Sequence, residues 1–166
     1  MKKVKDLMTK RVVAFTPEDT IFKAAKTFCR RNISGAPVIK DKKNKEVIGV
    51  VSDSDIVQFI GFNVCTPDIS DNVAGDYVYQ SLTLLFFNMV RMGKSWFDAR
   101  KEVRRISKTK IKDVMTKDAL YATPEMTIFE AASKMKANDV NRLPVLDDKN
   151  RLVGIIARQD ILKALI

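Results

Sequence analysis

The chain has 166 residues, of which 46% are hydrophobic and 30% are charged, and its formal net charge at pH 7 is +10. This composition excludes an intrinsically disordered chain. The most apolar run, Leu82–Val90, is about half of the roughly 20 residues that span a bilayer, so we expect no transmembrane helix. The charged N-terminus lacks an apolar signal region, so we expect a cytoplasmic protein without a membrane partner. The positive charge fits nucleic acid, an anionic membrane surface, phosphorylated small molecules or an acidic protein, and does not choose among them.

The chain contains two cysteines, Cys29 and Cys65, and no histidine. Neither cysteine has a second ligand at metal-binding spacing, so we expect no metal site. Without histidine there is no Ser-His or Cys-His pair, and no glycine-rich phosphate loop occurs, so we expect no catalytic residue and no enzyme. Two reduced thiols are the simpler interpretation, and a Cys29–Cys65 disulfide is the alternative.

The sequence contains two copies of one unit. Val4–Lys10 recurs as Ile111–Lys117, and Thr16–Ala25 recurs as Thr123–Ala132. The later segments Ala36–Ile39, Val47–Val51 and Asp55–Val57 recur, in the same order, as Leu143–Leu146, Leu152–Ile156 and Asp160–Leu162. Such repetition indicates a duplicated structural unit. We predict a first repeat over residues 1–61, a linking insertion over 62–110 and a second repeat over 111–166.

Each copy predicts the element order β-α-β-β-α. The first strands, Val12–Phe15 and Ala119–Ala122, end at Thr-Pro because proline cannot continue a ladder. Helices then start at Thr20 and Thr127, the second with a capping box formed by Thr127 and Glu130. Each hairpin has a polar turn, and each copy closes with a helix. The turns are Lys40–Glu46 and Asp147–Arg151, and the closing helices are Asp53–Ile60 and Arg158–Ile166.

One copy, at about 55 residues, is marginal as an independent core. We therefore predict an α+β fold in which the two repeats pack about a pseudo-two-fold axis and leave two related clefts between them.

The insertion predicts a loop over Phe62–Gly75, an apolar helix over Asp76–Met92, and a second helix from Ser95 to about Ile106. The stretch from Arg91 to Lys112 is strongly basic. A nucleic-acid-binding protein that uses this stretch is our alternative interpretation. A core-packing stripe beside a solvated basic face explains the same pattern without a partner.

The repeats follow one order of motifs: Met-Thr, a strand, Thr-Pro, a Thr-Ile-Phe-x-Ala-Ala helix, small-x-Pro-Val, and Gly-Val-Val-Ser-x-x-Asp. This order resembles the cystathionine-β-synthase (CBS) domain. The pair resembles the tandem arrangement called a Bateman module. The resemblance covers residues 4–61 and 111–166. It implies a regulatory sensor of an adenosine ligand such as AMP, ADP, ATP or S-adenosylmethionine, often a homodimer, whose signal passes to an effector protein.

In that family the Ser/Thr-x-x-Asp motif holds the ribose, and it corresponds to Ser52 and Asp55 here. The same residues fit a simple helix capping box, which needs no ligand. By the resemblance Arg142 reaches the phosphates, and Ala119 and Leu120 line the adenine. The expected main cleft comprises Ser52, Asp55, Ala119, Leu120, Val140, Asn141, Arg142 and Pro144.

The second cleft departs from the family pattern, because Ala157 replaces the hydroxyl residue and Gly35 stands in place of the arginine. Arg158 is the expected substitute for that arginine. We therefore rank the main cleft as the occupied one. The second set comprises Val12, Val13, Ile33, Ser34, Gly35, Pro37, Arg158 and Asp160.

Overall fold

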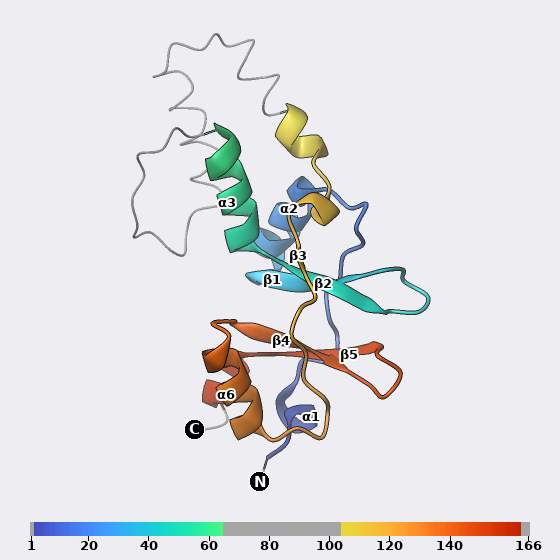
Figure 1. The fold of residues 1–166 in the computed structure, drawn as a ribbon, viewed down its shortest axis with the longest axis vertical. Helices are drawn as coiled ribbons and strands as arrows, with labels where there is room; N and C mark the ends of the chain where they lie inside the picture. Colours follow the sequence, from blue (N-terminus) through green and yellow to red (C-terminus); the bar gives the residue numbers. More distant parts are fainter. Residues whose placement is uncertain (1, 65–103, 164–166) are drawn as a thin grey trace. The chain divides into compact units, whose positions relative to one another are not determined.

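The computed structural model describes residues 2–64 and 104–163, with only the backbone described for residues 60–64 (Figure 1). The described residues divide into two compact units. Unit 1 holds residues 2–16, 36–50 and 116–163, and unit 2 holds residues 17–35, 51–64 and 104–115. The units therefore do not coincide with the two sequence repeats, because unit 1 contains strands from both.

The second repeat contributes a β-hairpin to unit 1. Strands β4 (Arg142–Leu146) and β5 (Leu152–Ala157) pair antiparallel, with Leu143 opposite Ile156. The Asp147 amide donates to the Arg151 carbonyl at 3.0 Å and closes the turn. This hairpin is the one predicted from its two apolar runs.

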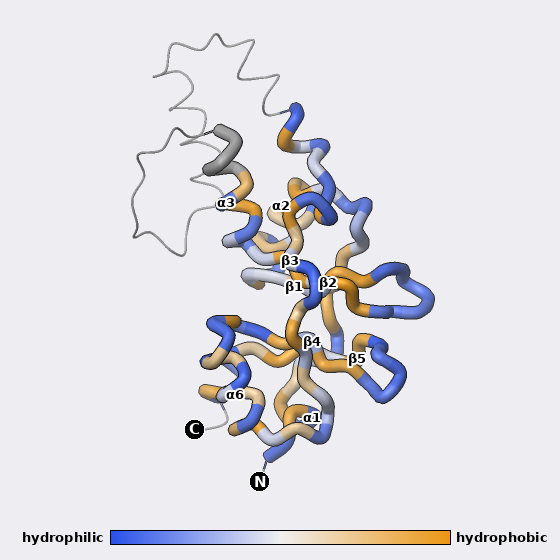
Figure 2. Tube along the Cα trace, viewed as in Figure 1, coloured by the Kyte–Doolittle hydropathy of each residue, from blue (hydrophilic) through white to orange (hydrophobic). Residues whose placement is uncertain are grey.

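The first repeat forms a three-stranded sheet in the order β1 (Gly35–Ile39), β2 (Val47–Ser52) and β3 (Thr116–Lys117). Strand β3 comes from the start of the second repeat and pairs antiparallel with β2, with Thr116 opposite Val50. Figure 2 shows apolar strands and hydrophilic hairpin turns in both repeats. The turns are joined by the Leu152 amide, which donates to the Lys45 carbonyl at 3.0 Å.

The two predicted first strands are much shorter than expected. In place of Val12–Phe15 and Ala119–Ala122, the structure forms single parallel bridges from Phe15 to Val38 and from Ala122 to Val145. Each bridge is formed by two backbone hydrogen bonds. The Thr-Pro that follows ends the pairing, because proline has no amide hydrogen to donate.

The helices begin where the sequence predicted. Helix α2 (Ile21–Arg31) is capped by Thr20, whose hydroxyl accepts from the Lys23 amide at 3.2 Å. Helix α6 (Ile128–Ala137) starts with the predicted capping box of Thr127 and Glu130. Each helix buries an apolar stripe, as the spacing predicts.

The closing helices are α3 (Asp53–Val64), which contacts α2 within unit 2, and α7 (Arg158–Lys163), which contacts α6 within unit 1. Helix α3 continues past the predicted end at Ile60 into the residues expected to start a loop. Gly61 costs about 1 kcal/mol in a helix interior but removes no hydrogen bond. The rest of the predicted insertion, residues 65–103, lies outside the described residues, and residues 104–108 are helical.

Unit 1 has a continuous apolar core. Its fully buried members are Val4, Ala122, Ala131, Met135, Leu143, Val145 and Ile156. All except Val4 belong to the second repeat. The burial of Val4 there means that the beginning of the first repeat completes the core of the second.

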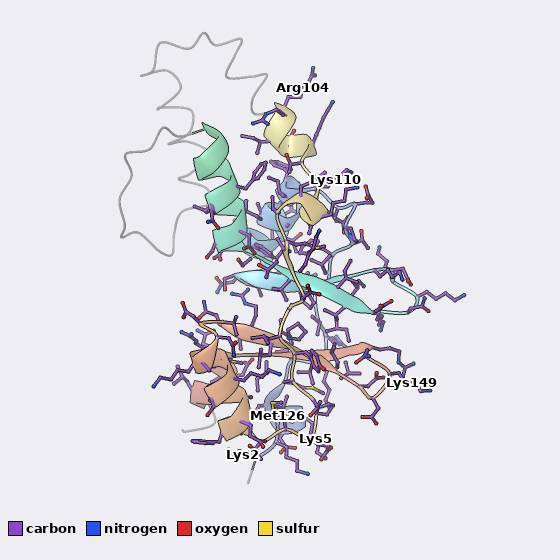
Figure 3. The ribbon with its side chains drawn as sticks, in the orientation of Figure 1. Lys2, Lys5, Arg104, Lys110, Met126 and Lys149 are labelled. Atoms are coloured by element: carbon purple, nitrogen blue, oxygen red, sulfur yellow. The ribbon has the colours of Figure 1, made fainter. Side chains whose placement is uncertain are left out.

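The start of each repeat packs on the other repeat. We call residues 2–9 the N-terminal arm, which contains α1 (Val4–Leu7), and residues 109–117 the second arm, which contains the 3-10 turn η1 (Ile111–Asp113) and β3. The Val4 amide donates to the Met126 carbonyl at 2.9 Å, and the Ile111 amide donates to the Asp19 carbonyl at 2.8 Å. Figure 3 shows Lys5 beside Met126 at this end of unit 1. Each arm therefore docks on the repeat to which it does not belong in sequence. The repetition in the sequence did not reveal this arrangement.

Candidate functional site

The Asp55 carboxylate lies in the first turn of α3 and is held by Ser52. Its Oδ2 atom accepts from both the Ser52 amide and the Ser52 hydroxyl at 2.7 Å. The Asp55 amide donates back to Ser52 Oγ at 3.2 Å. No described residue hydrogen-bonds to Asp55 Oδ1. One oxygen is therefore fixed by the helix cap while the other remains open to a donor.

The equivalent acid of the second repeat is held less firmly. Asp160 Oδ2 accepts only from the Ala157 amide, at 2.9 Å, because Ala157 has no hydroxyl. Its Oδ1 atom has no partner in the described part of the chain. Both carboxylates are half-buried, so each can meet a polar ligand group at an apolar surface.

Each acid-bearing helix is tied to the loop that precedes the first hairpin strand of its own repeat. The Asp53 amide donates to the Ser34 carbonyl at 3.1 Å, and the Arg158 amide donates to the Asn141 carbonyl at 3.0 Å. The amides of Ile33 and Val140, which lie in these loops, close the ends of α2 and α6. The backbone therefore ties Ile33 and Ser34 to the helix of Asp55, and Val140 and Asn141 to the helix of Asp160. The predicted sets instead combine each acid with the loop of the other repeat.

The predicted apolar residues of each cleft lie on segments that cross from one sheet to the other within unit 1. Val12 and Val13 lie between Thr9, which bridges to Ile155 of β5, and Phe15, which bridges to β1. Ala119 and Leu120 lie between β3, on the first sheet, and the bridge from Ala122 to β4. These four residues are half-buried, so part of their surface faces outward.

The two candidate arginines differ in their surroundings. Arg142 is the first residue of β4 and is half-buried opposite Ala157. Arg158 is exposed, and its Nη2 atom lies 3.4 Å from Asp139 Oδ1. The Asp139 carboxylate was not singled out from the sequence, although its place two residues before Asn141 was a usable signal. An anion at Arg158 has to compete with this carboxylate.

The remaining predicted residues are buried. Pro37 and Pro144 are fully buried strand residues, and Gly35 is buried at the start of β1. In the main set, Ser52 and Asp55 belong to unit 2 and the other six residues to unit 1. In the second set, Ile33, Ser34 and Gly35 belong to unit 2 and the other five to unit 1.

Sequence analysis also missed an exposed aromatic residue beside the two residues predicted to line the adenine. Tyr121 follows Leu120 directly and is 45% exposed. Lys134 Nζ lies 5.1 Å from the centre of its ring and donates to its carbonyl at 2.8 Å. This contact fixes the end of the crossing segment that carries Leu120.

Part of the basic stretch offered as a nucleic-acid surface is engaged by an acid. Lys112 Nζ lies 2.7 Å from Glu18 Oε1, and Lys110 Nζ donates to the Glu18 carbonyl at 2.8 Å. Residues 91–103 of that stretch lie outside the described residues, as does Cys65, whereas Cys29 is exposed on α2. No described helix is long and apolar enough to cross a membrane, and the cytoplasmic location stays a prediction.

Comparison with known proteins identifies the architecture. The chain is 34% identical over 163 residues to the uncharacterized protein MJ1426 of Methanocaldococcus jannaschii, which covers 98% of this chain and 90% of that protein. Its fold resembles CBSX2 from Arabidopsis thaliana, solved in complex with AMP, with a TM-score of 0.67, 23% identity and coverage of 99% and 96%. It also resembles the CBS domain pair of MJ0100, solved with 5′-methylthioadenosine and S-adenosyl-L-methionine, with a TM-score of 0.68, 20% identity and coverage of 99% and 96%.

Three further relatives are longer proteins, of which this chain spans 23%, 38% and 46%. The family profile of the CBS domain matches residues 4–61 and again residues 111–166. The chain therefore belongs to the CBS domain family and carries the domain as a tandem pair.

Proposed function

We propose that this CBS pair is a regulatory module that binds an adenosine-containing ligand, with Asp55 as the ribose-binding group of the preferred site. The observation that carries the proposal is the hydrogen-bonding of Asp55, which fixes Oδ2 and leaves Oδ1 open. A carboxylate held in this way accepts hydrogen bonds from the two ribose hydroxyls without first having to be ordered. The ligands of CBSX2 and MJ0100, which are AMP, 5′-methylthioadenosine and S-adenosyl-L-methionine, share an adenosine group and support this class.

In the main site, Arg142 supplies the charge-assisted hydrogen bonds that a phosphate requires. Ala119 and Leu120 supply apolar surface and backbone groups for the adenine. Val140 and Asn141, in the loop before β4, complete the set, and the fully buried Pro144 would only support the strand.

The second site, around Asp160, is the weaker one in this proposal. Ala157 gives its carboxylate one hydrogen bond where Ser52 gives two, and Gly35 offers no cation. Arg158 supplies a cation only after leaving Asp139. Ligand at this site would meet Val12, Val13, Ile33 and Ser34, whereas the fully buried Pro37 would only support the strand.

The output of the module is a change of conformation or assembly, which a ligand drives only through unequal affinity for two states. A homodimer or an effector protein receives the signal. Each repeat exposes an aromatic and an aliphatic side chain on its two helices, and these are candidate contact residues. They are Phe22 and Val57 in the first repeat and Phe129 and Leu162 in the second.

Isothermal titration calorimetry with adenosine, AMP, ADP, ATP and S-adenosylmethionine tests the proposal. Asp55→Ala should weaken the preferred ligand by roughly 10- to 100-fold, since a hydrogen bond to a charged group contributes about 1.5–3 kcal/mol. Arg142→Ala should weaken the phosphorylated ligands and spare adenosine. Asp53→Asn is the matched control, because its carboxylate Oδ1 accepts from the neighbouring Ser54 amide. The proposal fails if no adenosine ligand binds, or if Asp55→Ala leaves the affinity unchanged.

A further inference from the structure

The N-terminal arm docks on the second repeat through contacts that any copy of the chain can supply. Val4 is fully buried in the second repeat's core. Thr9 and Ile155 exchange two backbone hydrogen bonds of 2.9 and 3.1 Å. Lys3 and Lys5 reach the two oxygens of Glu125 at 2.6 and 2.7 Å. We propose that this arm exchanges between two copies of the chain, each copy's arm docking on the second repeat of the other.

The hinge for this exchange is the crossing segment over residues 10–14. Among the described residues, these five make no hydrogen bond, whereas Thr9 before them and Phe15 after them are both bridged to strands. A stretch of five residues extends to roughly 17 Å. Opening the hinge therefore breaks no hydrogen bond of its own, and only the arm's contacts must be released and remade.

The second arm is the internal comparison. It makes the same contacts in reverse, with Ile111 fully buried and Lys112 paired to Glu18. It continues into described chain on both sides, through residues 104–108 and residues 118–121. Within the described residues, the second arm is therefore tied to the chain on both sides, and the N-terminal arm is tied to it through the hinge.

Exchange replaces each arm contact by an identical contact in another copy, so the closed and exchanged forms differ mainly in entropy. A short tether gives the arm an effective concentration on the order of millimolar at its own groove. The closed form should therefore dominate in dilute solution, and exchanged dimers should appear as the protein approaches that concentration or refolds within it. This inference involves no ligand and does not rest on the proposed function.

A disulfide placed across the arm contact traps the exchange. Thr9 and Ile155 face each other in an antiparallel bridge, a spacing that a disulfide spans. Thr9→Cys and Ile155→Cys are combined in a Cys29→Ser, Cys65→Ser background. Light and ¹⁵N-labelled protein are mixed unfolded, refolded together and oxidised, either at about 10 µM or at about 1 mM, which is near the effective concentration.

Mass spectrometry should then find disulfide-linked peptides that join position 9 of a light chain to position 155 of a heavy chain, or the reverse. These mixed-label peptides should be several-fold more abundant at the higher concentration. Val50→Cys with Thr116→Cys is the matched control, because this pair is the equivalent contact of the second arm. It should remain within single chains at both concentrations. The proposal is overturned if the mixed-label peptides that link positions 9 and 155 are no more abundant than those of the control.

Shortening the hinge gives a second, independent measurement. Deletion of Val12 and Val13 strains the closed form but leaves the arm and its groove intact, and strained hinges favour exchange. Native mass spectrometry should show a larger dimer fraction for the deletion variant than for the unaltered chain at the same concentration. A folded, monomeric deletion variant contradicts the proposal, and if the variant does not fold, the cysteine pair decides.

Discussion

Val4 and Ile111 are equivalent residues of the two repeats, and each is fully buried against the repeat to which it does not belong in sequence. Both are followed by a lysine that pairs with a glutamate of that other repeat. The first residues of each repeat therefore act as core residues of its neighbour, and their substitution should affect the neighbour's stability.

Val4→Ala should lower the free energy of unfolding by about 2 kcal/mol, because it removes buried methyl groups and leaves a cavity. Ile111→Ala should cost more, about 3 kcal/mol, since it removes a larger side chain from an equally buried position. Urea denaturation measures both. Asp148→Ala, in an exposed turn, is the control and should stay within about 0.5 kcal/mol. An arm that contributes nothing to stability would leave Val4→Ala equal to this control.

The Ser52 cap predicts a pair of opposite changes. Ser52→Ala should lose about 1 kcal/mol of stability, because the Asp55 amide loses its acceptor and Oδ2 loses a donor. Ala157→Ser should restore the same cap in the second repeat and gain up to about 1 kcal/mol. Thermal unfolding checks the signs. Equal effects at the two positions would contradict the difference seen between the two acids.

Lys45 occupies the left-handed region with φ of 55°, and the equivalent Asn150 has φ of 57°. Asparagine tolerates this conformation better than lysine. Lys45→Asn should therefore raise the free energy of unfolding by about 0.5–1 kcal/mol, and Asn150→Lys should lower it by a similar amount. The Lys45 carbonyl, which accepts from Leu152, is retained in the variant. Chemical denaturation of the two single variants tests the pair, and changes of the same sign would refute it.

Gly154 lies under the Met8 side chain of the N-terminal arm. A Cβ atom at Gly154 would lie 2.5 Å from Met8 Sδ and 3.0 Å from Met8 Cγ. Gly154→Ala should therefore destabilise the protein by about 1 kcal/mol or less, because the flexible methionine side chain has to move. The penalty should shrink when Met8→Ala is added, and a double-mutant cycle measures this coupling. Additive effects of the two substitutions would show that the contact is not the cause.

The ion pairs of the N-terminal arm predict a response to acid. Hydrogen bonds from Lys3 and then Lys5 lower the pKa of Glu125 from its usual 4.5 to about 2. A depressed folded pKa stabilises the protein above the unfolded value, and this contribution is lost as pH falls from about 4.5 to about 2. The stability difference between the unaltered chain and Glu125→Gln should shrink across that window in acid titrations of unfolding. Because Glu125 is exposed, added salt should reduce the difference as well. A difference independent of pH would contradict the pairing.

Local signals predicted the local structure well. Thr20 and Thr127 each supply a hydroxyl to an otherwise unpaired amide, and both helices begin after them. The polar turns predicted the hairpins for a similar reason, since turn chemistry acts over a few residues. Strand length was harder to predict, because Val12 and Ala119 are apolar but their backbones find no neighbouring strand with which to pair.

The docking of each arm on the other repeat could not be predicted from the repeats. The equivalence of Val4 and Ile111 is visible in the sequence, but the pattern does not show which repeat buries which residue. The structure shows this from the path of the chain, which bridges to β5 at Thr9 and to β1 at Phe15. The acids were found because Asp55 and Asp160 repeat within a motif, whereas Asp139 belongs to no motif and emerges only from its contact with Arg158.

The reciprocal arms also limit how this molecule can be divided. A fragment that holds the first repeat alone would begin with the N-terminal arm but would lack the second repeat on which this arm docks. It would also lack β3, which pairs with β2 of its own sheet. Splitting the gene between the repeats therefore yields two incomplete pieces. A permuted chain that moves residues 2–9 to join the second repeat completes that repeat, whereas the first repeat still needs residues 109–117.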